Sequence, residues 1–199
     1  MPHARVQVQI HSQCVLFLQT VIEHNNGQHT HIGMKLRSII HYFTGKGRKT
    51  GVNTTPQRNV SMEKYLGRWY EQARFENWFE EGLEEVFTDY TAGPDGSINV
   101  VNCGKKRNGH QCSSRGRAYP CGAGRLKVSF VPPYGWFKAP YHILYTDPDY
   151  QGALVSGDGE EYLWLLTREK TPDSGLLETL RCEAQKRGFD TALLRQTRQ

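Results

Sequence analysis

The chain has 199 residues, of which 37% are hydrophobic and 23% charged, and its formal net charge is +5. This length suits one domain with a single sizeable core and an extension, and the composition excludes a disordered or collagen-like chain. The basic residues are scattered, and the run from Lys46 to Lys49 is typical of a solvated linker, so nucleic acid is not an expected partner.

Residues 1–58 are expected to form an N-terminal extension and linker. Residues 1–33 show no sustained helical or strand period, and translation from Met34 in place of Met1 is an open alternative. Residues 45–59 have the Gly, Lys, Thr and Pro content of a linker. The apolar run from Cys14 to Leu18 is far shorter than the roughly 20 residues of a membrane-spanning helix. No small-residue cleavage site follows it, so it does not read as a signal peptide.

From residue 65 onward, short β-rich runs alternate with turn sequences that contain Gly, Pro and Asp. The expected strands cover 65–75, 83–90, 97–103, 113–119, 125–131, 139–146, 151–156 and 161–167, with Pro120 stopping the fourth. Their even spacing predicts an all-β fold, an eight-stranded up-and-down antiparallel barrel. The segment 76–82, which contains Trp78 and Phe79, is expected to cross one opening.

A single helix should follow the last strand and pack outside the barrel. Thr171 is a suitable N-cap, and Pro172 suits the first helical position. Leu180 and Ala184 fall on one apolar face, and Gly188 ends the helix. A short strand over 189–194 is expected to pair with the first strand.

Three separated stretches carry a resemblance to a known family. Gly67-Arg68-Trp69 resembles the Gly-x-Trp signature that opens the lipocalin fold, and it is followed at the expected distances by 146–150 (Thr-Asp-Pro-Asp-Tyr) and by Arg168. The resemblance covers roughly 60–194 and is closest to the bacterial lipocalins related to apolipoprotein D. It implies a lipocalin domain over 59–199, closed by a structural floor in which an arginine stacks over a tryptophan. The floor residues are Gly67, Trp69, Thr146, Asp147 and Arg168.

Strand alternation predicts which side chains face the interior of the barrel. The candidate ligand-binding residues are Glu71, Ala73, Phe75, Asn102, Val128, Phe130, Tyr141, Ile143, Tyr145, Tyr162 and Trp164. The small residues Ser114, Gly116 and Ala118 should also face inward and leave a cavity. An apolar pocket with a few polar groups suits a long hydrophobic molecule, and the resemblance favours storage or transport of a fatty acid or lysophospholipid.

The resemblance also implies a cell-envelope location, in the periplasm or at the outer membrane, with association with a membrane surface and a homodimer as further expectations. Because the N-terminal segment offers no clear export signal or lipid-anchor motif, a cytoplasmic location is the alternative. No cofactor is expected.

Two other functions remain as alternatives. One is an enzyme on the same barrel, a thiol-dependent isomerase that uses Cys103 or Cys112 with His110 as the neighbouring base. The other is a structural barrel with a filled interior. No catalytic residues are assigned, and the nine-residue spacing of Cys103, Cys112 and Cys121 is wider than known structural zinc sites use, so no metal is expected. A disulfide between Cys103 and Cys112 and free thiols both stay open.

Overall fold

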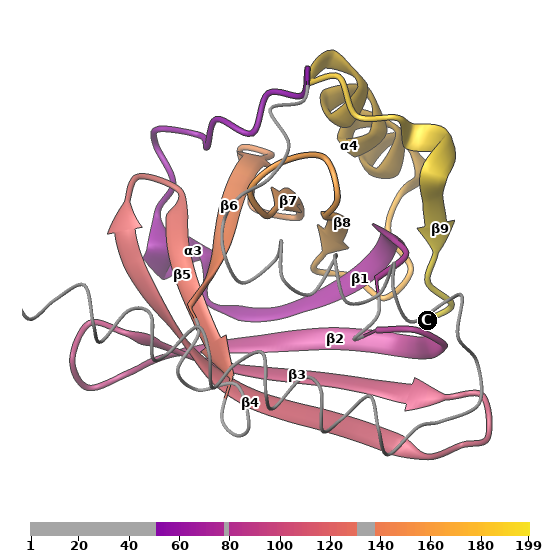
Figure 1. The fold of residues 1–199 in the computed structure, drawn as a ribbon, viewed down its shortest axis with the longest axis horizontal. Coiled ribbons are helices and arrows are strands. Elements are labelled where there is room, and N and C mark those ends of the chain that lie inside the picture. The colour runs from indigo at the N-terminus through magenta and orange to yellow at the C-terminus, as the bar shows by residue number, and fades with distance from the viewer. Residues whose placement is uncertain (1–50, 78–79, 131–137) are drawn as a thin grey trace, which may run out of the picture. The chain divides into compact units, whose positions relative to one another are not determined.

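The computed structural model describes residues 51–77, 80–130 and 138–199. Within these ranges nine strands form one antiparallel sheet in the order β2-β3-β4-β5-β6-β7-β8-β1-β9, and an additional pairing of β1 with β2 closes the sheet into a barrel (Figure 1). Every neighbour in the sheet from β2 to β8 is also the next strand along the chain. The predicted up-and-down barrel of eight strands, with a helix outside it, is confirmed.

The strand limits follow the turn residues closely. The strands are β1 (Gly67–Phe75), β2 (Leu83–Ala92), β3 (Ile98–Lys106), β4 (Gln111–Gly122), β5 (Arg125–Phe130), β6 (Ala139–Thr146), β7 (Gly152–Ser156), β8 (Leu163–Thr167) and β9 (Leu194–Gln196). Contrary to expectation, Pro120 does not stop β4, because a register shift between Pro120 and Gly122 accommodates a residue that has no amide hydrogen.

Short helices flank the barrel. A one-turn helix, α3 (Met62–Tyr65), precedes β1, because the Ser61 side chain accepts a hydrogen bond from the Lys64 amide. The first strand therefore begins two residues later than predicted. The long helix is α4 (Ser174–Lys186), and its N-cap is Asp173 and not Thr171. The Asp173 carboxylate accepts from two free amides of the first turn, which a threonine two residues earlier could not reach.

Two apolar clusters divide the core. One fills the closed end of the barrel and includes Trp69, Tyr90 and Ile143. The other lies between the outer side of the barrel and α4, and includes Leu180 and Ala184 of the helix. The predicted apolar face of the helix is thus the face that packs on the barrel.

Two irregularities in strand register change which side of the barrel wall the following side chains face. The register shifts between Glu71 and Ala73 in β1, and between Ile143 and Tyr145 in β6. One extra residue in a strand turns every following side chain to the opposite face. Ala73, Phe75 and Tyr145 therefore pack in the outer cluster beneath α4, and the prediction that they face the interior is wrong.

Both ends of the described chain are held against the barrel. In residues 51–58, which the sequence assigns to a linker, Gln57 accepts from the Thr146 amide at 2.7 Å and donates to the Ile143 carbonyl at 3.0 Å. At the other end, β9 pairs with β1 as expected, although at 194–196 and not within 189–194. The tail then bridges β1 and β2, with the Gln199 side chain donating to the Val86 carbonyl at 2.8 Å.

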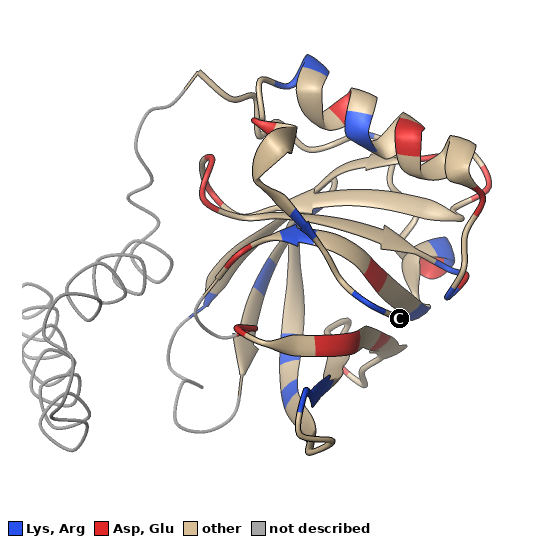
Figure 2. Ribbon diagram, turned by 90° about the vertical axis from the view of Figure 1, so that its right-hand side faces the viewer, with Lys and Arg blue, Asp and Glu red and all other residues tan. Residues whose placement is uncertain are grey.

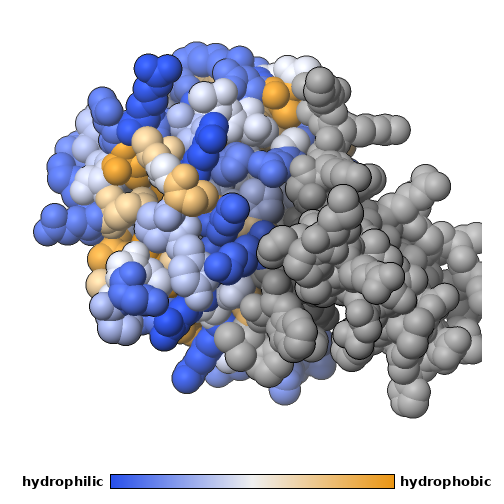
Figure 3. Space-filling model, turned by 60° about the vertical axis from the view of Figure 1, so that its left-hand side comes forward, coloured by the Kyte–Doolittle hydropathy of each residue, from blue (hydrophilic) through white to orange (hydrophobic). Residues whose placement is uncertain are grey.

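The outer surface offers little apolar area. Charged residues lie along α4 and on several strands (Figure 2), and the face in Figure 3 is mostly hydrophilic with small apolar groups between. Leu193 is the one large hydrophobic side chain that is exposed in the described ranges. No helix among these residues is long and apolar enough to cross a bilayer. The predictions for Met1, Met34, Cys14, Trp78 and Phe79 lie outside the described residues.

Candidate functional site

The closed end of the barrel is built around Trp69. This side chain is fully buried, and its indole nitrogen donates to the Tyr65 carbonyl at 2.8 Å. The guanidinium carbon of Arg168 lies 3.8 Å from the centre of the Trp69 ring, and the Tyr65 ring packs beside the indole at 5.0 Å between centroids. The predicted stacking of an arginine over this tryptophan is present.

Arg168 ties three segments together at this floor. Its guanidinium donates to the carbonyls of Arg68 at 2.7 Å, Lys64 at 2.6 Å and Tyr150 at 3.2 Å. Gly67 has a φ of +99°, and a Cβ atom there would lie 3.2 Å from the Arg168 side chain. Both the backbone conformation and the close approach require glycine at this position.

The third stretch of the floor is the turn after β6. The Asp147 carboxylate accepts from the Gly152 amide at 2.5 Å and from the Asp149 amide at 3.1 Å, which shapes the turn from within. Strand β8 ends beside this turn, where the Arg168 amide donates to the Gln151 carbonyl at 2.8 Å. The three stretches that the sequence singled out thus meet at the closed end of the barrel.

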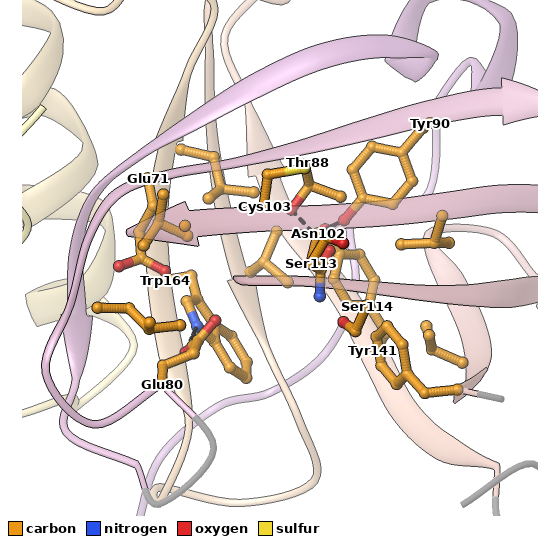
Figure 4. A pocket seen from close by; sticks show the side chains of 18 of the residues that line it. Glu71, Glu80, Thr88, Tyr90, Asn102, Cys103, Ser113, Ser114, Tyr141 and Trp164 are labelled. Atoms are coloured by element: carbon orange, nitrogen blue, oxygen red, sulfur yellow. Dashed lines mark hydrogen bonds between the residues drawn. The ribbon is translucent and has the colours of Figure 1, made fainter. Parts of the chain in front are cut away.

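Above the floor lies a cavity of about 470 Å³, which is within the usual range for small-molecule sites. Its apolar side comes from β5 to β8 and includes Val128, Val155 and Leu166. Its polar side comes from β2 to β4 and includes Thr88 and Asn102, whose side chains hydrogen-bond to each other at 2.9 Å. Figure 4 shows Tyr90 and Tyr141 at one end and Glu71, Glu80 and Trp164 at the other.

The cavity brings together part of the predicted set. Six of the eleven candidates line it, and they are Glu71, Asn102, Val128, Phe130, Tyr141 and Trp164. Ile143 is fully buried in the packed floor cluster. Tyr162 is also buried and lies outside the lining, where it stacks on Trp164 with 5.9 Å between ring centroids. Whether the lining residues touch a ligand stays a prediction.

The closed end of the cavity carries a chain of three tyrosine hydroxyl groups. The Tyr141 hydroxyl lies 2.6 Å from that of Tyr65 and 2.9 Å from that of Tyr90. Burial raises the pKa of Tyr90 to about 12 and raises the pKa of Tyr141 well above its usual value. All three groups therefore stay protonated at physiological pH, and this end of the cavity is polar but uncharged.

The other end of the cavity carries a network of buried charges. Glu71 is 2% exposed, and its carboxylate accepts from Arg74 and from the Thr197 hydroxyl of the C-terminal tail. Glu80 accepts at one oxygen, Oε2, from the indole nitrogen of Trp164 at 2.9 Å. The guanidinium of Arg74 also donates to the backbone carbonyl of Glu80 at 2.6 Å and lies 3.9 Å from its carboxylate. A single arginine therefore contacts both glutamates.

Glu71 should make stability depend on pH. Burial, and next the neighbouring Glu80 carboxylate, raise the pKa of Glu71 to about 7, whereas an unfolded glutamate titrates near 4.3. The folded state therefore holds this proton more tightly, and the stability that Glu71 contributes is present below about pH 4.3 and is lost as the pH rises through 7.

We expect Glu71→Gln to remove this loss. The free energy of unfolding of the wild type should fall by about 2–3 kcal/mol more than that of the variant when the pH is raised from 5 to 8. Urea unfolding at the two pH values measures the change, with Glu160→Gln, at an exposed position, as the matched control. An equal response of both variants to pH would contradict the assignment.

The cysteines do not form a reactive pair. The register of β3 and β4 sets Cys103 opposite Ser113, and Cys112 opposite Gly104, so the two cysteine side chains leave opposite faces of the sheet. Both are free thiols. Burial, and then the Asp89 carboxylate, raise the pKa of the Cys103 thiol, which lowers its reactivity at neutral pH.

Several lining residues were missed by the sequence analysis. Thr88 and Tyr90 come from β2, whose interior face could have been found by the same alternation, since Val86, Thr88 and Tyr90 are two residues apart. Glu80 lies in a connecting segment, where no periodic pattern applies. Among the described residues no group of three or more His, Cys, Asp or Glu side chains is arranged to hold a metal ion.

Comparisons with known proteins agree with this geometry. The family model of the lipocalin-like domain matches residues 60–199. The outer membrane lipoprotein Blc of Escherichia coli (strain K12) is 38% identical over 148 residues, which cover 69% of this chain and 82% of that protein. Apolipoprotein D of Macaca fascicularis is 28% identical over 150 residues, covering 69% and 77%. Insecticyanin from the tobacco hornworm Manduca sexta shares the fold, with a TM-score of 0.61, 15% identity and coverage of 73% and 84%.

Proposed function

The chain belongs to the lipocalin family, and from that premise we propose that its cavity binds a single-chain lipid, either a fatty acid or a lysophospholipid. Family membership supports the binding or transport of a small hydrophobic ligand. The observation that carries the finer proposal is the cavity of about 470 Å³ between a tyrosine-lined floor and a polar far end. Burial of an acyl chain supplies about 0.8 kcal/mol per methylene, which offsets the cost of ordering the chain.

Binding is favoured over catalysis and over a filled barrel. Cys103 and Cys112 lie on opposite faces of the sheet and so cannot act together, and burial raises the pKa of the Cys103 thiol, which makes it less reactive. A filled barrel would leave no room inside, whereas small side chains such as Ser114 line an open volume here. The relatives called Blc are named outer membrane lipoproteins, and we propose a cell-envelope location for this chain on that likeness.

The proposal can be tested with a lysophosphatidylcholine that carries a fluorophore at the end of its acyl chain. We expect saturable binding of one molecule per chain. Trp164 lines the cavity and donates to Glu80, so Trp164→Ala should weaken binding about tenfold, equivalent to about 1.4 kcal/mol. Trp164→Phe, which keeps an aromatic face, should stay close to the wild type.

Thermal unfolding of both variants separates a lost contact from a lost fold. Both should melt cooperatively, because Trp164 borders the cavity and is only partly buried where it packs against the core cluster. Absence of saturable binding to the wild-type protein would refute the proposed function.

A further inference from the structure

The charged residues that line the cavity in the described ranges all carry the same sign. Two carboxylates line it, those of Glu71 and Glu80. No lysine or arginine is among the lining residues in the described ranges. Among the described lining residues, the cavity thus offers two carboxylates to a positive charge and no cationic side chain to a negative charge.

Arg74 only partly neutralises these carboxylates. It is opposite Trp164 in the register of β1 and β8 and so points to the inner side of the wall, but it is 1% exposed and is not a lining residue, because it is buried against Glu71 and Glu80. One guanidinium against two carboxylates leaves one net negative charge when both glutamates are ionised. This charge is largely buried, since the Glu71 residue is 2% exposed and the Glu80 side chain 13%, and buried charges interact more strongly than charges in bulk solvent.

Glu80 is the carboxylate best placed to meet a ligand. In the described residues, the side chains of Trp164 and Asn77 both donate to its Oε2 atom, which leaves Oε1 available. The Trp164 indole lies beside it at the same end of the cavity (Figure 4). A carboxylate oxygen next to an aromatic face is a favourable environment for an ammonium group.

The opposite end of the cavity has no positively charged side chain among its described lining residues. The Tyr141 hydroxyl bonds to those of Tyr65 and Tyr90, so two of the three protons are engaged within the chain of hydroxyls. Burial opposes negative charge on Tyr90 and Tyr141, as their raised pKa values show, and the same desolvation would act on a ligand carboxylate placed there.

We infer that the cavity selects its ligand by head-group charge: it takes a single-chain amphiphile whose head carries an ammonium group, held by Glu80 and Trp164, and it rejects a free carboxylate. This inference rests on the proposed function and narrows it, since a fatty acid and an ammonium-bearing lipid fill the same apolar volume. The acyl chain runs towards the tyrosine end, and the head stays at the end that holds the two glutamates.

The test uses three ligands that share one hexadecyl skeleton and differ in head charge. Hexadecylamine is cationic at pH 8, hexadecanol is neutral, and palmitate is anionic. Each competes, below its aggregation concentration, with the uncharged fluorophore 1-N-phenylnaphthylamine for the intact protein. We expect the amine to bind at least tenfold more tightly than palmitate, with the alcohol between them.

A matched pair of variants assigns the selectivity to Glu80. Glu80→Gln should reduce the amine-to-palmitate ratio to less than about threefold, with little effect on hexadecanol. Asp89→Asn removes a carboxylate that is paired with Arg68 on the outer surface, and it should leave the ratio unchanged. If Glu80→Gln unfolds, the ranking of the three ligands by the wild-type protein still decides.

Three results would overturn the inference. Equal affinities for the three ligands, or tighter binding of palmitate, would show that head charge does not select, while the proposed function would stand. An equal fall of the ratio in both variants would show a general charge effect and not a contact with Glu80. Failure of all three ligands and of the fluorophore to bind would remove the proposed function, and this inference with it.

Discussion

Replacement of Trp69 by alanine is expected to lower the free energy of unfolding by about 3–5 kcal/mol, the usual cost of deleting a buried tryptophan. Trp69 is fully buried, does not line the cavity, and packs within the floor cluster. Its loss would open a void, leave the Tyr65 carbonyl without the indole donor, and remove the ring on which Arg168 stacks. Urea unfolding followed by tyrosine fluorescence or circular dichroism measures the change.

Arg168→Lys is the matched variant for this floor. Lysine keeps the positive charge, but it lacks the planar fork that reaches the carbonyls of Arg68, Lys64 and Tyr150. We expect a smaller loss than for Trp69→Ala, of about 1–3 kcal/mol. If Trp69→Ala cost less than about 1 kcal/mol, the floor would not be the element that closes and stabilises the barrel.

Replacement of Ser114 by tryptophan should weaken ligand binding by at least 30-fold while the barrel stays folded. Ser114 lies on the inner face of β4, where it pairs with Asn102 and lines the cavity. An indole at this position would occupy a large part of the volume that a ligand needs. Because that volume is empty, the added side chain should not cause the strain that overpacking produces in a filled core.

Arg115→Trp provides the control, because it adds the same side chain one residue further along the same strand. Arg115 borders a groove on the outer face of β4, between β3 and β5. Its replacement should change affinity by less than twofold. Titration of both variants with the fluorescent lysophosphatidylcholine measures the difference, and wild-type affinity in Ser114→Trp would show that the ligand does not enter this cavity.

The sequence was sufficient for the architecture. Turn residues between short alternating runs give the strand number and their up-and-down order, since each turn acts over a few residues. The floor could also be predicted from the sequence, because Gly67, Trp69 and Arg168 stand at separations typical of one family. A backbone φ of +99° beneath an arginine requires glycine at position 67, and such a requirement can be recognised in the sequence.

The sequence predicted only in part which side chains face the cavity. Alternation placed Val128, Phe130 and Tyr141 on the cavity correctly, because no register shift interrupts β5 or precedes Tyr141 in β6. It failed for Ala73, Phe75 and Tyr145, each of which follows a shift. A bulge adds one residue without changing composition, and apolar residues suit both the barrel interior and the layer beneath α4.

The sequence by itself therefore determined the barrel, its strand order and its floor, because these depend on short-range turn chemistry and on residues whose size or conformation has no substitute. Only the tertiary structure decided which side of the wall each residue faces after a bulge, and that Glu71, Arg74, Glu80 and Thr197 form one buried network at the cavity. The physical reason is that these outcomes depend on pairing between strands and on contact between segments up to 126 residues apart, which no local pattern encodes.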